Sequence, residues 1–350
     1  MAETSISSKI DNPIRKCEPN YGRAINILQI IPTFLKVGGI EFSSRNLALS
    51  LLKKGIRTTI LSPTNRSSFS ECNERITTVH IHSLLICNKT VIPLDLSSML
   101  HLIKNHDVIH IYGLFSLMSV LAFLFSFLCK KRVLITVLMY GELMNHPNVA
   151  IRAIAPLITN IGKLFVKLAD AIHVKNIQDY NRLRKINPTT LLIPNGLSNR
   201  YFEQKIDQIS IRKELGLQDS KIALYVGRIH LFKGPQILVK SVRYILRYIK
   251  DFHVIIAGPD DGFEKQLKTV IETENVCDHV TLLGFVSEGK KIQLYDGANV
   301  VVIPSLFDWV EAYSNVASEA WFRNKKVVAS KVGALKYRVR ENDKGYLLCP

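Results

Sequence analysis

Short apolar runs alternate with longer segments of helical periodicity along most of this chain. Each run is rich in Ile, Val and Leu, as strands that are buried on both faces of a sheet must be. The strands predicted in the first half are Ile25–Ile31, Arg57–Ser62, Ile76–His82, Val108–Tyr112, Val133–Leu138, Ala171–Val174 and Leu191–Pro194. Those predicted in the second half are Ala223–Val226, His253–Ala257, Val280–Leu283, Val300–Ile303, Val327–Ala329 and Tyr346–Leu348. This alternation is typical of parallel sheets with helices on both faces, so we predict an α/β protein.

The strand and helix pattern stops and restarts once, which predicts two doubly wound domains. The tripeptide Pro194-Asn195-Gly196 favours a turn and precedes a polar stretch, so we place the join between the domains there. A chain of 350 residues also suits two domains of roughly 100 to 200 residues each. The expected organisation is a flexible tail at 1–24, a first domain at 25–198 and a second domain at 199–350.

The composition excludes several classes of protein. With 47% hydrophobic residues and only 18 Gly and 13 Pro, the chain is neither disordered nor collagen-like. Its polar opening residues lack the apolar stretch of a secretory signal. No two cysteines form a CxxC pair, which argues against a disulfide framework or a structural zinc site and favours a reducing compartment. The six cysteines are Cys17, Cys72, Cys87, Cys129, Cys277 and Cys349.

Positive charge is concentrated in the first half of the chain. The formal net charge is +17, and residues 1–198 carry +12 of it, with 23 Lys and Arg against 11 Asp and Glu. Such an excess indicates an anionic partner, either nucleic acid or acidic lipid, although the solvated lysines of a generally basic protein give the same numbers. The sequence contains no recognised nucleic-acid module and no basic patch interleaved with aromatic residues, so we expect no nucleic-acid partner.

Two segments of the first half have membrane-like features. Leu114–Cys129 has no charged residue, but it is shorter than the roughly 20 residues that span a bilayer, so we expect a buried or surface-lying helix. In the helix predicted at 148–168, Arg152, Lys163 and Lys167 fall within about 60° of one another around the helix axis. The rest of that helix is strongly apolar, a pattern typical of an interfacial helix as much as of a half-buried one.

Ligands of open α/β sheets bind at the carboxyl ends of strands, so the loops after predicted strands are the candidates for a site. Gly38-Gly39 follows the first strand and opens a helix, where backbone amides and the helix dipole favour an anion. Such a pair is also common in simple turns. The loop GRIHLFKG, Gly227–Gly234, holds Arg228 and Lys233, which suit a diphosphate. An exposed basic loop is the alternative interpretation.

A third pattern, EAYSNVASEAW at Glu311–Trp321, follows the strand predicted at 300–303. Ser314 or Asn315 fits the N-cap of a helix, so Glu311 precedes that helix and Glu319 lies within it. The helix N-terminus favours a phosphate, and the two carboxylates can accept hydrogen bonds from sugar hydroxyls. Two glutamates so close to a helix are also commonly no more than solvated side chains.

In order and spacing, these three loops resemble those of family 4 glycosyltransferases, which use nucleotide sugars and have the GT-B fold of two facing Rossmann-like domains. The likeness covers nearly all of residues 25–350, and its most specific part is the pair GRxxxxKG and ExxxxxxxE. Supporting pieces are VGGIE near the start, DVIHIYG at 107–113, IPNG at 193–196 and IAGPDDG at 256–262. The resemblance implies the GT-B fold for this chain.

The resemblance also implies a role for each matching residue. Arg228 and Lys233 bind the donor diphosphate, and Gly39 approaches it from the first domain. Glu311 contacts the donor sugar, while Glu319 accepts hydrogen bonds from the ribose hydroxyls. The implied catalytic residues are Glu311, Arg228 and Lys233. The implied donor-binding residues are Gly39, Gly227, Arg228, Lys233, Glu311, Ser314, Asn315 and Glu319.

Enzymes of this family retain the anomeric configuration and use no metal and no other cofactor, and this sequence offers no DxD motif to hold a metal ion. The charge that develops on the leaving nucleotide diphosphate must then be stabilised by fixed cations and by the helix N-terminus near Ser314.

The sequence departs from the family pattern at two places. Many members have a His before the glycine that corresponds to Gly141, and this chain has Tyr140 there. His110 is a candidate polar group in its place, and both His110 and Tyr140 are assigned either to the acceptor side or to no definite role, since a His at a strand end is more often structural. Family members also continue past Pro350 with helices that cross back to the first domain. We therefore expect either a truncated chain or an incomplete second domain, with a weakened joint between the domains.

We therefore expect a cytoplasmic, retaining glycosyltransferase that moves a sugar from a nucleotide-diphosphate donor to a hydroxyl of a glycan or lipid-linked acceptor. Family members that extend lipid-linked glycans contact membranes, which favours an anionic membrane surface, on the inner face of the cell membrane, as a further partner of the basic first domain. The alternative is a catalytically impaired GT-B scaffold that binds a nucleotide sugar or a partner protein.

Overall fold

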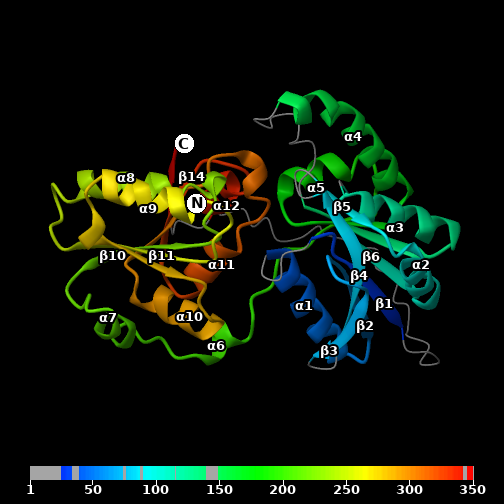
Figure 1. Ribbon diagram of the computed structural model, residues 1–350, viewed down its shortest axis with the longest axis horizontal. Helices are drawn as coiled ribbons and strands as arrows, with labels where there is room; N and C mark the ends of the chain where they lie inside the picture. Colours follow the sequence, from blue (N-terminus) through cyan, green and yellow to red (C-terminus); the bar gives the residue numbers. More distant parts are fainter. Residues whose placement is uncertain are drawn as a thin grey trace, which may run out of the picture.

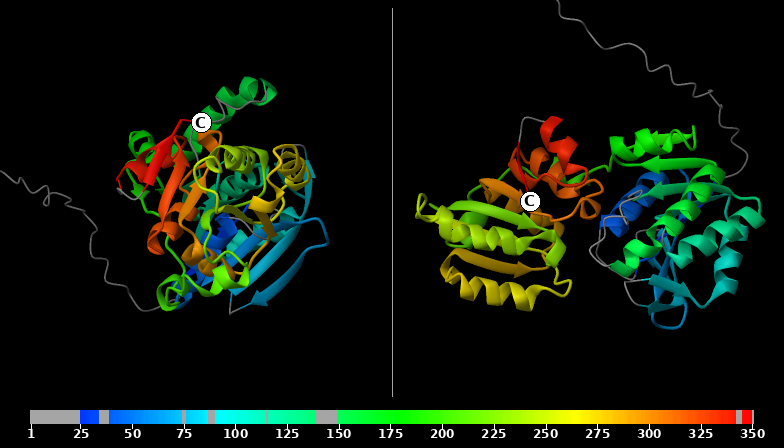
Figure 2. Two further views of the ribbon diagram at one scale, coloured as in Figure 1. Left: turned by 90° about the vertical axis from the view of Figure 1, so that its left-hand side faces the viewer. Right: turned by 90° about the horizontal axis from the view of Figure 1, so that it is seen from above.

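The computed structural model describes residues 25–33, 39–73, 76–86, 90–114, 116–138, 149–341 and 345–349. These form two α/β domains that lie side by side (Figure 1), and the view from above, on the right of Figure 2, shows the same arrangement. Each domain is built on one sheet, and residues 193–220 connect the two sheets. The tail predicted at 1–24 lies outside the described residues.

The sheet of the first domain is largely parallel. Its strands are β1 (Asn26–Ile30), β2 (Arg57–Thr64), β3 (Phe69–Asn73), β4 (Ile76–Ile86), β5 (Thr90–Pro93), β6 (Val108–Tyr112), β7 (Arg132–Val137), β8 (Ala171–Val174) and β9 (Thr190–Leu192). Their order is β3-β4-β2-β1-β6-β7-β8-β9, with β5 paired to β4. Both β3 and β5 are antiparallel to β4, whereas the remaining pairs in this sheet are parallel.

Helices cover both faces of this sheet because successive strand residues point to opposite sides. In β1, Leu28 and Ile30 pack into the main core, whereas Gln29 faces the other side and accepts a hydrogen bond from Ser44 of α1 at 2.6 Å. The first-domain helices are α1 (Gly39–Leu52), α2 (Leu96–Asn105), α3 (Leu117–Leu128), α4 (Val149–Leu168) and α5 (Ile177–Leu183). Residues of α2, α3, α4 and α5 contribute to the main core, and Ala48 of α1 packs in a second cluster on the opposite face.

The apolar segment Leu114–Cys129 forms α3, whose buried residues Met118 and Phe123 belong to that main core. The expected buried or surface-lying helix is therefore a packed part of the first domain. Within the described ranges, no helix combines the length and the apolar character that crossing a bilayer requires.

The second domain has a wholly parallel sheet with the order β12-β11-β10-β13-β14-β15. Its strands are β10 (Lys221–Val226), β11 (Phe252–Ala257), β12 (Val280–Gly284), β13 (Val300–Ile303), β14 (Lys326–Ser330) and β15 (Gly345–Leu348). Its longer helices are α8 (Pro235–Ile245), α9 (Glu264–Thr273), α10 (Glu288–Gly297), α11 (Asn315–Phe322) and α12 (Leu335–Glu341). In β10, Ile222 and Leu224 pack against one core while Ala223 and Tyr225 pack against the other. This double burial explains why β10 is an unbroken apolar run.

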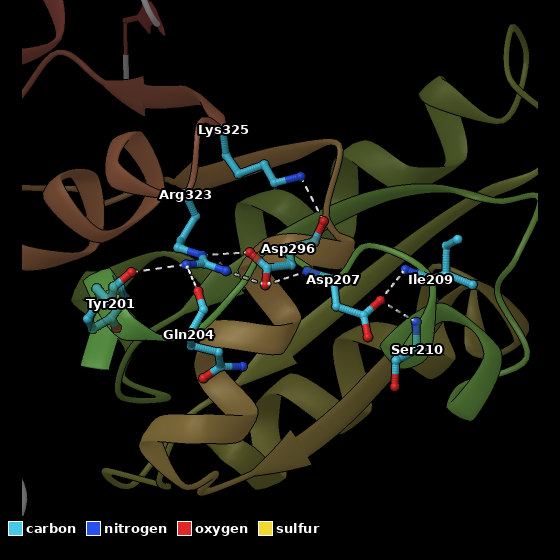
Figure 3. Close-up of polar contacts among 8 residues, drawn as sticks. All are labelled: Tyr201, Gln204, Asp207, Ile209, Ser210, Asp296, Arg323 and Lys325. Atoms are coloured by element: carbon cyan, nitrogen blue, oxygen red, sulfur yellow. Dashed lines mark hydrogen bonds and ion pairs between the residues drawn. The ribbon is translucent and has the colours of Figure 1, made fainter. Parts of the chain in front are cut away.

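The segment between the sheets is tied to the second domain by a buried charge cluster (Figure 3). It contains the short helices α6 (Arg200–Glu203) and α7 (Ser210–Glu214). Arg323 forms two hydrogen bonds with Asp296, at 2.7 and 2.6 Å, and donates to the carbonyl oxygens of Tyr201 and Gln204. Lys325 donates to the carbonyl oxygen of Asp296. Chain beyond Tyr201 is therefore fixed to the second domain.

The strand pattern of the sequence missed two elements, β3 and β5. Both lie at the β4 side of the first sheet and pair antiparallel. In β3, the sequence FSECN has exposed side chains at Phe69 and Cys72 and lacks the apolar run of a doubly buried strand. The prediction of parallel strands therefore holds for the remaining strands of both sheets.

Candidate functional site

A cavity of about 520 Å³ lies where the two domains meet. The second domain contributes the ends of β10 and β13 and the start of α11, while the first domain contributes the start of α1 and the residue after β8. It therefore lies at the carboxyl ends of parallel strands, as expected for a ligand site in an α/β fold. Among the predicted residues, those that line it are Gly39, Gly227, Arg228, Lys233, Glu311, Ser314 and Asn315.

Gly234 allows the basic loop after β10 to approach β13 closely. Its φ is +74°, and a Cβ at this position would lie 1.9 Å from the carbonyl oxygen of Pro304. Only glycine fits such a backbone contact. The preceding 3-10 turn (Leu231–Lys233) thereby lies against the chain that follows β13, which places Lys233 next to Glu311.

The carboxylate of Glu311 is buried and held by two donors. Lys233 Nζ lies 2.7 Å from Glu311 Oε1, and Ser305 Oγ donates to the same oxygen at 2.6 Å. Lys233 also donates to the carbonyl oxygen of Val310 at 3.3 Å. Both members of the pair line the cavity, so one anionic and one cationic group are fixed at its wall.

Arg228 forms the second ion pair of the cavity wall. Its Nη1 lies 2.6 Å from Oδ2 of Asp261, a residue of the IAGPDDG segment after β11. The hydroxyl of Tyr225 donates to the carbonyl oxygen of Arg228 at 2.7 Å, which fixes the backbone of the loop. Burial raises the pKa of Tyr225, and the nearby Glu311 carboxylate adds to this effect, so the phenol keeps its proton and remains a donor.

The N-terminus of α11 opens on the same cavity. Ser314 occupies the N-cap position with φ +63°, but its side chain forms no capping hydrogen bond within the described chain. Asn315, the first helical residue, accepts a hydrogen bond from Asn195 at 2.7 Å, and Asn176 donates to the carbonyl oxygen of Ala312 at 3.2 Å. Ser314 therefore leaves the first backbone amides of α11 open to a ligand. Asn176 of the first domain and Asn195 of the 193–220 linker bind next to these amides.

Glu319 does not line the cavity, although it lies on the same helix. It is buried, accepts a hydrogen bond from the hydroxyl of Tyr295 at 2.7 Å and lies 3.2 Å from Nζ of Lys291. The ammonium of Lys291 lies 5.6 Å from the ring centre of Phe42 in α1, so the Lys291 side chain also contacts the first domain. The carboxylate is thus held in one orientation behind the start of α11.

His110 lies inside the first sheet and does not line the cavity. It is buried, its Nε2 is 2.7 Å from Thr136 Oγ1, and Thr136 Oγ1 is 2.9 Å from Nδ1 of His173. Burial lowers the pKa of His110 to about 3, with the nearby His173 and Lys175 acting in the same direction. His110 is therefore a neutral, hydrogen-bonded histidine within the sheet, which agrees with the structural role that the sequence left open as the alternative. Tyr140 lies outside the described residues.

Glu41 and Lys175 line the cavity but were not among the predicted site residues. Glu41 belongs to the VGGIE segment and accepts a short hydrogen bond from Thr33. Burial raises the pKa of Glu41, against the opposing effects of Thr33 and Arg228. Lys175 directly follows β8, so inspecting every residue after a predicted strand would have found it.

Among the described residues, no group of three or more His, Cys, Asp or Glu side chains is placed to hold a metal ion. The polar groups gathered at the cavity are instead two ion pairs, whose cations both lie in the loop after β10 and whose acids follow β11 and β13, and a helix N-terminus.

Two Rossmann-like domains that meet around such a cavity define the GT-B class of fold, and the chain has this fold. Residues 207–350 match the family model of glycosyl transferases group 1. The resemblance to GT-B glycosyltransferases that the three loops indicated is therefore confirmed.

Two relatives illustrate the sequence similarity. An uncharacterized glycosyltransferase of Methanocaldococcus jannaschii is 32% identical over 163 residues, which cover 45% of this chain and 40% of that protein. The D-inositol 3-phosphate glycosyltransferase of Corynebacterium glutamicum is 32% identical over 143 residues, which cover 39% and 34%. The matches thus span between a third and two fifths of these relatives.

Two solved structures illustrate the similarity of fold. Sucrose-phosphate synthase from Thermosynechococcus elongatus has a TM-score of 0.72 at 22% identity, covering 93% of this chain and 86% of that one. HepE of Anabaena, in complex with UDP and glucose, has a TM-score of 0.71 at 18% identity with the same coverage. At such identities the likeness concerns the fold alone.

Proposed function

We propose that this protein is a metal-independent, retaining glycosyltransferase that moves a sugar from a nucleotide-diphosphate donor to a hydroxyl of a glycan or lipid-linked acceptor. One observation carries the proposal. Arg228 and Lys233 come from the loop after β10, Glu311 and the start of α11 come from the segment after β13, and all of them converge on one cavity between the domains.

The cationic side of the cavity suits the diphosphate of a donor. Arg228 offers a planar guanidinium fork and Lys233 a compact ammonium, and the open amides of α11 add the positive end of a helix dipole. During transfer, negative charge grows on the leaving diphosphate. Fixed cations and amides stabilise that charge without reorganising, which is the largest single contribution in many enzymes. In this proposal they do so in place of a metal ion.

The acidic groups suit the hydroxyls of the donor. Glu311 is held by Lys233 and Ser305 and keeps one carboxylate oxygen for the sugar. Glu319 lies just outside the lining of the cavity, oriented by Tyr295 and Lys291, and is the proposed acceptor for the ribose hydroxyls. Glu319→Ala and Lys233→Ala are each expected, as single substitutions, to abolish transfer.

The test begins with donor binding to the full chain. A thermal-shift panel of UDP-, GDP- and ADP-glucose should reveal one donor that raises Tm, because binding to the folded state stabilises it. Transfer to glycan and lipid-linked acceptors, with and without EDTA, and the anomer of the product by NMR then test the reaction. If no nucleotide sugar raises Tm, the proposal is wrong. Binding of a nucleotide sugar with no transfer to any acceptor and no hydrolysis of the donor favours the scaffold alternative.

We further propose that α4 rests on an anionic membrane surface. One face of α4 buries Phe165 and Val166 in the core, while an outer stripe remains 43% to 65% exposed despite being apolar. In Figure 1, α4 lies along the top edge of the first domain. The stripe consists of Leu157, Ile161, Leu164 and Leu168. The three cations predicted to lie together on this helix are also exposed: Arg152, Lys163 and Lys167. Apolar and cationic stripes side by side are typical of an interfacial helix.

Vesicle flotation tests this contact. The full chain should float with phosphatidylcholine vesicles that contain phosphatidylglycerol, and less with phosphatidylcholine alone. The double substitution Leu157→Ser and Leu164→Ser should abolish flotation, whereas Ile209→Ser, at an even more exposed apolar residue of the second domain, should not. Unchanged flotation of the double variant overturns the membrane assignment. The assignment is also wrong if the wild-type protein is a dimer and the double variant is a monomer, because the stripe then contacts a second copy of the chain.

A further inference from the structure

Lys175 is a buried lysine of the cavity wall that has no anionic partner among the described residues. It is 7% exposed, directly follows β8 and lines the cavity from the first domain. Within the described residues it has no hydrogen-bond or ion-pair partner, whereas the other buried charged side chains each have one. Those others are Asp179, Asp296, Glu311, Glu319, Arg323 and Lys325.

The backbone on both sides of Lys175 is fixed. On one side, His173 Nε2 donates to the carbonyl oxygen of Ile193 at 2.8 Å, so its Nδ1 accepts from Thr136. On the other, Asn176 caps α5 through the amide of Asp179 and also reaches Ala312 O in the second domain. The strand end and the helix start therefore hold the lysine at the domain interface.

The other two cations of the cavity wall are neutralised. Arg228 pairs with Asp261, and Lys233 pairs with Glu311. An unpaired buried ammonium destabilises the folded protein, because it loses its hydration and gains no hydrogen bond or ion pair in return. Burial lowers the pKa of Lys175 to about 8, so the ammonium is still mostly protonated at pH 7. A ligand that brought an anion to this position would regain the lost interaction.

We propose that Lys175 selects acidic sugars by binding a carboxylate or phosphate carried by one of the two sugar substrates. The inference rests on the proposed function and deepens it by naming a substrate class. The donor diphosphate is assigned to the cations and helix N-terminus of the second domain, so the anion that Lys175 meets is a separate one. A uronic acid donor and a phosphorylated or uronic acid acceptor share this chemistry.

Binding measurements distinguish the two sources. In the donor arm, UDP-glucuronate is compared with UDP-glucose. In the acceptor arm, glucose 6-phosphate and glucuronate are compared with glucose, each with and without UDP. Wild-type protein should prefer the acidic probe in one arm by about ten- to a hundredfold, the worth of one charge-assisted hydrogen bond. The preference should vanish in Lys175→Met and persist in part in Lys175→Arg.

Lys185→Met is the matched control, because Lys185 is an exposed lysine of the same domain that does not line the cavity. Circular dichroism and Tm establish that each variant is folded. A wild-type protein with no acidic preference in either arm, or a preference that survives Lys175→Met, overturns the inference. Equal binding of UDP-glucose and UDP-glucuronate still supports the proposed donor site. Failure of both nucleotide sugars counts against the proposed function, and the free sugars without UDP then decide the role of Lys175.

Discussion

Lys233 Nζ lies 2.7 Å from Glu311 Oε1, although 78 residues separate the two positions in the chain. The loops after β10 and β13 meet here because those strands are neighbours in the sheet. Lys233 remains partly exposed while Glu311 is almost fully buried. In the absence of a ligand, the cation that we assign to the donor diphosphate thus balances the acid that we assign to the donor sugar.

Replacing Lys233 by Ala should lower kcat/KM for transfer by about 100-fold or more. The variant loses a charge-assisted hydrogen bond to the diphosphate and the stabilisation of the leaving group. UDP alone should also bind more weakly. Steady-state kinetics and calorimetry with UDP measure the two effects, and Lys240→Ala, at an exposed lysine of α8, is the control. Normal turnover in folded Lys233→Ala would mean that the site is assigned wrongly.

Replacing Glu311 by Gln should separate sugar recognition from nucleotide recognition. The amide has the same shape as the carboxylate but a weaker acceptor for a sugar hydroxyl. We expect the affinity for UDP to stay within about threefold of wild type and the affinity for the UDP-sugar, together with turnover, to fall by about tenfold or more. An equal loss for UDP and UDP-sugar would show that Glu311 acts on the nucleotide or only on the fold.

The close approach at Gly234 should make Gly234→Ala strongly destabilising. The added Cβ would meet Pro304 O at 1.9 Å, so the loop must move away from β13 and take Lys233 with it. Gly262→Ala is the matched control, since Gly262 also has a positive φ, +87°, but no described neighbour within 4 Å of the added atom. The control should lose only about 1 to 3 kcal/mol from backbone strain. Urea unfolding of both variants measures the difference, and equal losses would contradict the steric argument.

The doubly buried strands could be predicted because burial on two faces leaves a continuous apolar run, as in β10. Strand β3 could not, because FSECN forms a strand only where β4 offers an edge to pair with. The basic loop after β10 was found because Arg228 and Lys233 lie close in sequence between two glycines. Asp261 and Lys175 also follow predicted strands, but the sequence does not show that Asp261 pairs with Arg228 or that Lys175 lines the cavity, since these contacts depend on strands and domains brought together by folding.

The buried cluster of Figure 3 should be sensitive to the loss of its arginine. Arg323→Met leaves the Asp296 carboxylate buried without its main partner and frees the carbonyl oxygens of Tyr201 and Gln204. We expect a loss of about 3 to 5 kcal/mol in the free energy of unfolding. Arg323→Lys should recover only part of it, because an ammonium cannot reproduce the two parallel hydrogen bonds. Urea denaturation followed by circular dichroism tests this, and a loss below about 1 kcal/mol for Arg323→Met would contradict it.

Removing the charge of Lys175 should stabilise the protein without ligand. Its pKa is about 8 in the folded protein, below the ordinary 10.5, so the folded state binds this proton more weakly than the unfolded state. Below pH 8 both states are protonated and the fold bears the full cost, on the order of 3 kcal/mol. Between pH 8 and 10.5 only the unfolded state keeps the proton, so the stability of the wild type rises with pH.

Lys175→Met should therefore exceed the wild type in free energy of unfolding at pH 7, and the gap should close as the pH rises toward 10.5. Urea unfolding at pH 7, 9 and 10 measures it, with Lys185→Met as a variant that should show no such gap. A wild type more stable than Lys175→Met at pH 7, or a gap that widens with pH, would show that the ammonium already has a stabilising partner in the folded protein. A closing gap together with lost acidic-sugar preference would mean that the chain accepts an unfavourable buried charge in order to bind its substrate.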